Sequence, residues 1–127
     1  KQDMQKAFEY YNRAIEAPIS TVSYYAYYNL AKYYYLTGNT ILIKDENKAI
    51  EYLNIASSHA IEASILLLYL YTKKYLENKD KAIYTKIEDL ISKIEKHPNY
   101  NKEIKLEIEK NLQKLKENNH INIDILN

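Results

Sequence analysis

Two stretches of the sequence, DMQKAFEYYNRA (residues 3–14) and DENKAIEYLNIA (residues 45–56), are related copies. Seven of their twelve residues are identical at the same offsets, and the two copies are 42 residues apart. A weaker third copy, KDKAIY (residues 79–84), repeats the Lys-Ala-Ile core 33 residues further on. Units of this length that recur along a chain are typical of α-solenoids, in which pairs of helices stack on one another. The repeat therefore predicts a right-handed α-solenoid of antiparallel helix pairs.

The segments around these copies also have the periodicity of helices, and a few residues mark where the helices end. Pro18 and Pro98 stop two of them, and Gly38 fits the left-handed conformation that ends another. The residues expected to open helices are Asp3, Thr21 or Ser23, Asp45, Asn78 or Asp80, and Asn99 or Asn101. The expected helices cover residues 3–16, 21–37, 45–58, 59–77, 78–97 and 99–118. The short loops between them imply antiparallel neighbours, so the sequence predicts an all-α protein of about six helices.

The composition excludes several functional classes. One glycine among 127 residues cannot supply a glycine-rich phosphate loop or the tight turns of a β-sandwich. The absence of cysteine excludes disulfides, thiolate zinc sites and thiol nucleophiles. The 18 basic and 17 acidic residues are interleaved, so no patch of uncompensated cations favours nucleic-acid binding. The apolar run of residues 65–68 is far shorter than a membrane span, so no span is expected.

The run AYYNLAKYYYLTG (residues 26–38), followed by DENKAIEYLNIAS (residues 45–57), resembles a Sel1-like repeat, a relative of the tetratricopeptide repeat. The positions that meet the family pattern are Ala26, Leu30, Ala31, Tyr34, Gly38, Asp45, Lys48, Ala49 and Ala56. The resemblance covers roughly residues 3–96. It departs from the pattern at residues 76–79, which replace the second glycine-containing turn. Resemblance to this family implies a protein-interaction scaffold without catalysis, of a kind frequent in bacterial proteins.

We expect residues 1–127 to form one domain, with residues 99–118 as a capping helix and residues 119–127 as a tail. On the capping helix, Ile104, Ile108, Leu112 and Leu115 form one apolar stripe, and the rest is expected to be solvated. A seam for a partner helix is the alternative for that stripe. The alternating isoleucines of the tail fit either a loose end or a segment that packs on a neighbouring chain. The start on Lys1 suggests an excised domain or a processed product, and together with the unpartnered first helix it suggests one segment of a longer solenoid or assembly.

No pattern in the sequence predicts catalysis, a cofactor or a metal site. His59, His97 and His120 are more than twenty residues apart, without the spacing of metal ligands, and are expected in exposed loops or caps. The acidic pairs at residues 45–46 and 88–89 are adjacent, and adjacent helical residues point about 100° apart, so they do not form a working dyad. We therefore predict that the protein is not an enzyme.

Tyrosine is the one unusual signal, because seven of the fifteen tyrosines fall within residues 24–35. Projected as a regular helix, that segment has a packing side made of Ala26, Tyr27, Leu30, Ala31 and Tyr34. In tetratricopeptide-like solenoids, which the sequence resembles, the first helix of each pair lines the concave surface. The register then places Tyr25, Tyr28, Asn29, Lys32 and Tyr35 toward a groove. The corresponding residues of the fourth helix are Glu62, Ile65, Leu66, Tyr69, Thr72 and Lys73.

From these positions we predict a partner-binding set of Tyr25, Tyr28, Asn29, Lys32, Tyr35, Tyr69 and Lys73. The first hypothesis is a monomeric or weakly self-associating module that binds a peptide or protein segment on a tyrosine-rich concave face. The alternative for the tyrosines is packing against a neighbouring repeat. The alternative function is a structural segment of a longer solenoid or assembly. Nucleic-acid binding through lysine and tyrosine stacking is a distant third.

Overall fold

The fold is known from a computed structural model, which describes residues 2–18, 20–38 and 42–119. All regular secondary structure within these residues is helical, so the all-α prediction is confirmed. The elements are α1 (Gln2–Glu16), α2 (Thr21–Leu30), the π-helical turn η1 (Ala31–Tyr35), α3 (Glu46–Ala56), α4 (Ile61–Asn78), α5 (Lys81–Glu95) and α6 (Lys102–Asn119). Asn119 is the last residue of α6, and the rest of the predicted tail, with His120, lies outside the described residues.

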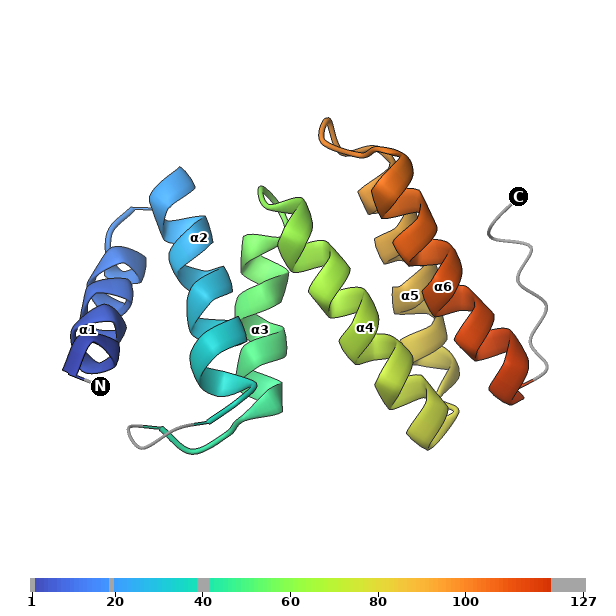
Figure 1. Ribbon diagram of the computed structural model, residues 1–127, viewed down its shortest axis with the longest axis horizontal. Coiled ribbons are helices and arrows are strands. Elements are labelled where there is room, and N and C mark those ends of the chain that lie inside the picture. The colour runs from blue at the N-terminus through green and yellow to red at the C-terminus, as the bar shows by residue number, and fades with distance from the viewer. Residues whose placement is uncertain (1, 19, 39–41, 120–127) are drawn as a thin grey trace. The chain divides into compact units, whose positions relative to one another are not determined.

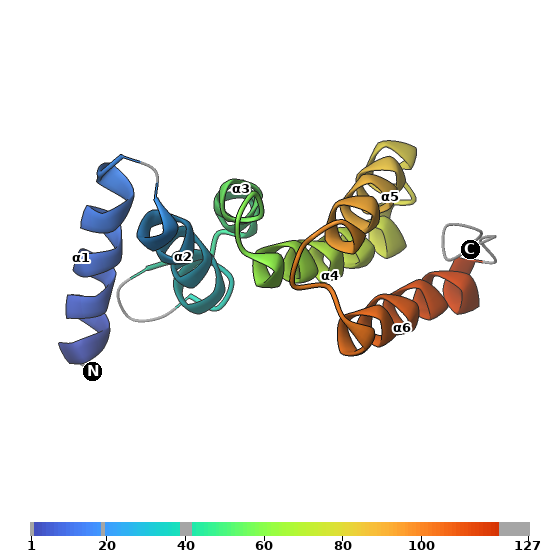
Figure 2. The same ribbon diagram turned by 90° about the horizontal axis from the view of Figure 1, so that it is seen from above.

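The chain divides into two compact units, residues 1–64 and 65–127, with the boundary inside α4. Successive helices run antiparallel in each unit, as the short loops predicted (Figure 1). In the first unit α2 lies between α1 and α3 in both views (Figure 2). In the second unit α5 and α6 both contact α4, through a Tyr75–Tyr84 ring pair and a hydrogen bond from Tyr69 to Glu107. The expectation of a single domain stays a prediction.

The side chains that begin the helices were mostly predictable. The Asp45 carboxylate accepts a hydrogen bond of 3.0 Å from the backbone N–H of Lys48, and Asp80 accepts one of 2.8 Å from Ala82. Asn101 begins α6 in the same way. These caps satisfy backbone donors that would otherwise lack a partner in the first helical turn.

Two helix starts differ from the prediction. Helix α1 already includes Asp3, so Asp3 is not its N-cap. Helix α2 is capped by Ser20, one residue before the predicted start. The Ser20 hydroxyl accepts from the backbone N–H of Ser23, and the Ser23 hydroxyl accepts from that of Ser20. This reciprocal pair is a capping box formed by two serines, whereas the usual sequence signature has Glu or Gln at the second position.

Two residues after helix ends have a left-handed backbone. Gly38 has φ +66°, as predicted for the residue that ends the second helix, and its N–H donates to the carbonyl of Tyr34. A Cβ at this position would lie 3.0 Å from the backbone nitrogen of Lys44. Lys79, which follows α4, has φ 56° although it is not glycine. Its ammonium donates to the carbonyl of Leu76, which helps to satisfy the end of α4.

The core of the first unit combines small and large apolar side chains. Its fully buried residues include Leu30, Ala31, Ala49, Leu53 and Ala56. Alanine at these positions of η1 and α3 allows close approach of the two segments, and Leu30 of α2 and Leu53 of α3 add large side chains to the same core. The alanine and leucine positions of the repeat are therefore packing positions, as the sequence indicated.

Tyr34 attaches α1 to this core. Its ring packs against those of Phe8 and Tyr11, with centroid distances of 5.1 and 6.4 Å. Its hydroxyl donates a hydrogen bond of 2.7 Å to the backbone carbonyl of Met4. Because the buried hydroxyl has a partner, Tyr34 contributes aromatic area to the core without the cost of an unsatisfied polar group.

The last turn of the second helical segment is a π-helix. The N–H of Leu36 donates to the carbonyl of Ala31, a bond that spans five residues in place of the usual four. The wider turn changes the phase of the residues that follow. Tyr34 and Tyr35 are both buried because they pack on different neighbours: Tyr34 contacts Phe8 and Tyr11 of α1, and Tyr35 contacts Tyr52 of α3.

The second unit has a core formed by α4, α5 and α6. Its fully buried side chains include Leu67, Leu68, Ile87, Ile94, Ile108, Leu112 and Leu115. On α6 the predicted apolar stripe is confirmed, with Ile108, Leu112 and Leu115 buried and Ile104 partly so. The expectation that the rest of α6 is solvated is wrong at Asn111, which is 2 % exposed. An asparagine gives no apolar signal in the sequence, so its burial was not predictable from periodicity.

Candidate functional site

Four of the predicted binding residues form a row on the first unit, which we call the tyrosine stripe: Tyr25, Tyr28, Asn29 and Lys32. Their spacing of i, i+3, i+4 and i+7 places them on one side of the helical segment. Tyr25 is 39 % exposed, Lys32 is exposed, and Tyr28 and Asn29 are partly exposed. The stripe therefore presents two aromatic rings, an amide and a cation on one surface.

Lys32 is held by two tyrosines. Its ammonium lies 5.6 Å from the ring centroid of Tyr28 and 5.2 Å from that of Tyr33. Hydrogen bonding and Coulombic interaction with Tyr28, followed by a smaller contribution from Tyr33, raise the pKa of Lys32. The charge is thus positioned over aromatic faces in a way that favours cation–π attraction. Tyr33, which is 51 % exposed, was not among the predicted binding residues.

His59 joins the other end of the stripe. It lies in the turn between α3 and α4, exposed as expected. Its ring stacks on Tyr24, with centroids 5.2 Å apart and planes at 8°, and the ring of Tyr25 meets it edge-on at 6.2 Å. The three rings form one aromatic cluster. No local sequence signal could have found this arrangement, because His59 is 34 residues from Tyr25 in the chain.

Tyr35 does not lie with the stripe. It is 9 % exposed, and its ring packs edge-on against Tyr52 of α3, with centroids 5.4 Å apart. The sequence placed Tyr35 with Tyr28 because seven residues of a regular helix make almost two turns, whereas the π-helical turn intervenes. Tyr35 therefore belongs to the packing of the first unit, and we remove it from the residues proposed to contact a partner.

The remaining two predicted residues, Tyr69 and Lys73, belong to the second unit. Tyr69 is 37 % exposed and donates a hydrogen bond to the Glu107 carboxylate of α6. This bond, together with burial, raises the pKa of Tyr69 to about 12, because losing the phenol proton next to a carboxylate is unfavourable. Lys73 is exposed one turn further along α4.

Tyr69 and Lys73 border a cavity of about 300 Å³ in the second unit. Its lining comes from two helices: Tyr69, Thr72, Lys73, Leu76 and Glu77 of α4, and Asn111 and Lys114 of α6. Thr72 was on the predicted groove side of its helix, and Asn111 and Lys114 were not predicted at all. Two of the lining residues, Thr72 and Asn111, are almost completely buried.

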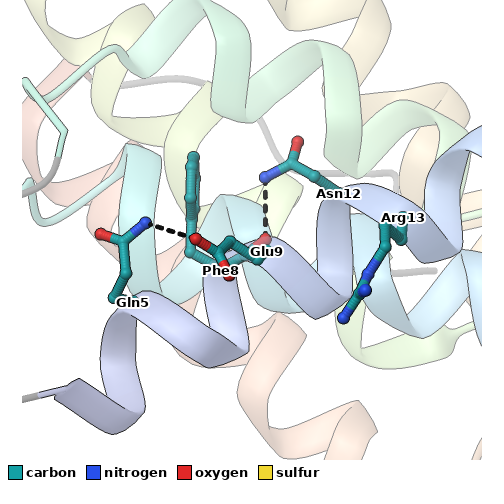
Figure 3. A pocket seen from close by; sticks show the side chains of 5 residues that line it. All are labelled: Gln5, Phe8, Glu9, Asn12 and Arg13. Carbon is teal, nitrogen blue, oxygen red and sulfur yellow. Dashed lines mark hydrogen bonds between the residues drawn. The ribbon is translucent and has the colours of Figure 1, made fainter.

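A hollow of about 430 Å³ lies along α1 of the first unit. It is lined by Gln5, Phe8, Glu9, Asn12 and Arg13, all from this single helix (Figure 3). The Gln5 amide donates to the Glu9 carboxylate and the Asn12 amide to the carbonyl of Phe8. The Arg13 side chain extends away from these pairs (Figure 3).

The described part of the chain contains no group of three or more His, Asp or Glu side chains placed to hold a metal ion. His97 lies after α5, where its Nδ1 accepts a hydrogen bond from the backbone N–H of Asn99. Among the same described residues, no helix combines the length and apolar character needed to cross a membrane.

The comparisons with known proteins relate to the first half of the chain. A family model described as Sel1 repeat matches residues 1–18 and 25–60. The match includes the tyrosine stripe, the π-helical turn and His59. No curated protein and no solved structure matches the chain. The matching repeats are of the type that stacks into helical solenoids, so the predicted fold class is confirmed.

Proposed function

Because the chain is a Sel1-like repeat protein, we propose that it binds a peptide or protein segment on the tyrosine stripe. Helical repeat modules of this family generally serve protein interaction without catalysis. The observation that carries this proposal is the partial exposure of the stripe. Its rings sit on the same helix as the buried residues Ser23, Ala26 and Leu30. These tyrosines therefore have surface left over after the first unit has packed.

The chemistry of the stripe suits an extended segment of mixed character. Tyrosine offers a large apolar area with few rotatable bonds, so ordering it on binding costs little conformational entropy. The Asn29 amide can donate to and accept from a peptide backbone, and the Lys32 ammonium can meet a carboxylate. The aromatic cluster of Tyr24, Tyr25 and His59 would take an apolar side chain.

We further propose that Tyr69 and Lys73 serve as partner contacts of the second unit. Both are exposed, and the Tyr69 hydroxyl is oriented by its bond to Glu107. An oriented hydroxyl loses less freedom when it meets a partner.

Selection from a phage-displayed library of random peptides against the folded protein supplies a peptide ligand for testing this proposal. The affinity of a selected peptide is then measured by fluorescence anisotropy. Joint replacement of Tyr25→Ala and Tyr28→Ala should weaken binding more than about tenfold, because aromatic anchors carry much of the binding energy. The matched control is Tyr10→Ala, which removes an exposed tyrosine of α1.

The control should bind as the unchanged chain does, and circular dichroism should give the same helicity for all three proteins. Peptides that bind the double variant with undiminished affinity would contradict the proposed surface. So would a large loss caused by Tyr10→Ala alone.

A second candidate function is a structural segment of a longer solenoid. The hollow along α1 supports it, because a neighbouring helix could fill a depression lined by one helix (Figure 3). Size-exclusion chromatography with light scattering tests it: self-association that Arg13→Glu, a change at an exposed lining residue, removes would support stacking. A monomer at high concentration would count against stacking.

A further inference from the structure

The tyrosine stripe lies in a part of the chain that has no acidic residues. Residues 17–44 contain neither Asp nor Glu, although 17 of the 127 residues of the chain are acidic. The charged residues of this run are Lys32 and Lys44, and only Lys32 belongs to the stripe. The stripe therefore has one cation and no carboxylate.

The charge of Lys32 is not neutralised within the described part of the chain. Its ammonium contacts the rings of Tyr28 and Tyr33, at 5.6 and 5.2 Å from their centroids. No carboxylate is among the groups that shift the pKa of Lys32, and its side chain is exposed. A ring face attracts a cation but leaves its net charge unchanged, whereas an ion pair would cancel that charge. The group that complements this surface is therefore an anion.

The two rings also restrict where the ammonium lies. A lysine side chain has many rotamers, and fixing them costs conformational entropy when a partner binds. Contact with the rings of Tyr28 and Tyr33 limits these rotamers before a partner arrives. Tyr33 is 51 % exposed, so its ring is available for this contact instead of filling the core.

We propose that the tyrosine stripe selects peptide or protein segments that carry an acidic side chain, Asp or Glu, which pairs with Lys32. Tyr28 and Tyr33 act as positioning residues for the ammonium. One exposed cation matches one carboxylate, whereas binding to a nucleic acid depends on neutralising several phosphates. This inference rests on the proposed binding of a segment to the stripe, and it adds the charge of that segment.

Matched phage-displayed libraries test the charge preference. Their random peptides differ in a central residue fixed as Glu, Gln or Lys, and each peptide is joined to the coat protein through its C-terminus. A preference among the libraries therefore comes from a side chain and not from a free chain end. Selection on the unchanged protein should enrich peptides of the Glu library most.

The best peptide of the Glu library is then made with Glu, Gln or Lys at the fixed position, and fluorescence anisotropy gives the three affinities. The Glu form should bind about fivefold more tightly than the Gln form, and the Lys form most weakly. This ratio is at the upper end for exposed ion pairs, because the ammonium is already positioned.

Replacing the cation should change the order of the three peptides. Lys32→Met should bind the Glu and Gln forms equally, and Lys32→Glu should bind the Lys form most tightly. The matched control is Lys105→Met, which removes an exposed lysine of α6 in the second unit and should keep the preference for Glu. Circular dichroism should show the same helicity for all variants, because both lysines are exposed.

Two variants of Tyr33 separate positioning from packing. Tyr33→Phe keeps the ring face and should keep the preference for Glu over Gln. Tyr33→Leu removes the ring face and should reduce the preference to about twofold, the loss expected for one exposed cation–π contact. An equal preference in the two variants would contradict the positioning role.

The outcomes distinguish this inference from the proposed function. Selected peptides that lose affinity for the Tyr25→Ala, Tyr28→Ala double variant, yet bind equally well with Glu or Gln, would overturn the acidic preference and leave binding on the stripe intact. A preference for Glu that persists in Lys32→Met would also overturn it. Peptides whose affinity does not change in the double variant would remove both proposals.

Discussion

The tyrosines of residues 24–35 fall into two groups with opposite environments. Tyr25 and Tyr28 are partly exposed on the stripe, while Tyr34 and Tyr35 are buried, six to ten residues later on the same helical segment. One residue type therefore serves packing in one group and is available for binding in the other. The phase of the helix decides which, and the buried pair forms the last two residues of the π-helical turn, which alters that phase.

The buried group gives the largest expected effect on stability. Tyr34→Ala removes the ring contacts with Phe8 and Tyr11 and the hydrogen bond to the Met4 carbonyl. Loss of a large buried aromatic side chain should lower the free energy of unfolding by about 3–5 kcal/mol. Urea denaturation followed by circular dichroism measures it. The neighbouring Tyr33→Ala is the control. Equal losses of unfolding free energy in the two variants would contradict the division into buried and exposed tyrosines.

Gly38→Ala should have the next largest effect. The position has φ +66°, and a Cβ there would meet the Lys44 backbone nitrogen at 3.0 Å. Strain of this kind costs about 1–3 kcal/mol. Lys79→Gly is the matched control, since it places glycine where a left-handed lysine stands, and its stability should change by less than about 1 kcal/mol. The Tm values of both variants measure this effect. Equal Tm values for Gly38→Ala and the unchanged chain would contradict the expected strain at residue 38.

Alkaline pH should lower the stability by a smaller amount, through the buried Tyr52. Burial, reinforced by Tyr35, raises the pKa of Tyr52 from 10.0 to about 12. The folded state therefore favours the neutral phenol. Its stabilising contribution is complete below pH 10 and is lost as the pH rises toward 12. Urea midpoints measured from pH 9 to 11.5 should fall less steeply for Tyr52→Phe than for the unchanged chain; parallel curves would contradict this assignment.

The exposed pair should give the smallest effect on stability. Tyr25→Ala and Tyr28→Ala leave the buried side of α2 unchanged, so each should change the free energy of unfolding by less than about 1 kcal/mol. Differential scanning calorimetry can resolve the corresponding shift in Tm. A loss comparable to that of Tyr34→Ala would place these rings among the packing residues, and the proposed binding surface would fail with it.

Much of the fold could be predicted because the signals were local. Asp45 and Asp80 cap helices through backbone groups two or three residues away, and Gly38 takes the backbone conformation that its missing Cβ allows. Projection of residues 24–35 as a helix identified Ala26, Leu30 and Ala31 as packing residues, and all three are buried. The Ser20–Ser23 capping box was missed because serine at its second position lacks the usual acidic or amide signature.

The candidate sites were predictable only in part, because they depend on tertiary contacts. Tyr35 was misplaced by assuming a uniform helix through a turn that is wider than α-helical. His59 and Asn111 meet their neighbours across 34 to 42 residues of chain, beyond the reach of any helical period. Thr72 was on the predicted groove side of its helix, but it is buried by tertiary packing that the helical period does not show.

The π-helical turn also bears on how the length of this segment can vary. A π-helical turn holds one residue more than an α-helical turn, so residues 31–35 are equivalent to an α-helix with a single insertion. Removing the exposed Tyr33 would give a regular helix of the same span, with the residues before and after it in their present registers. A one-residue gap in this turn, when related repeats are aligned, therefore need not mark a change of fold.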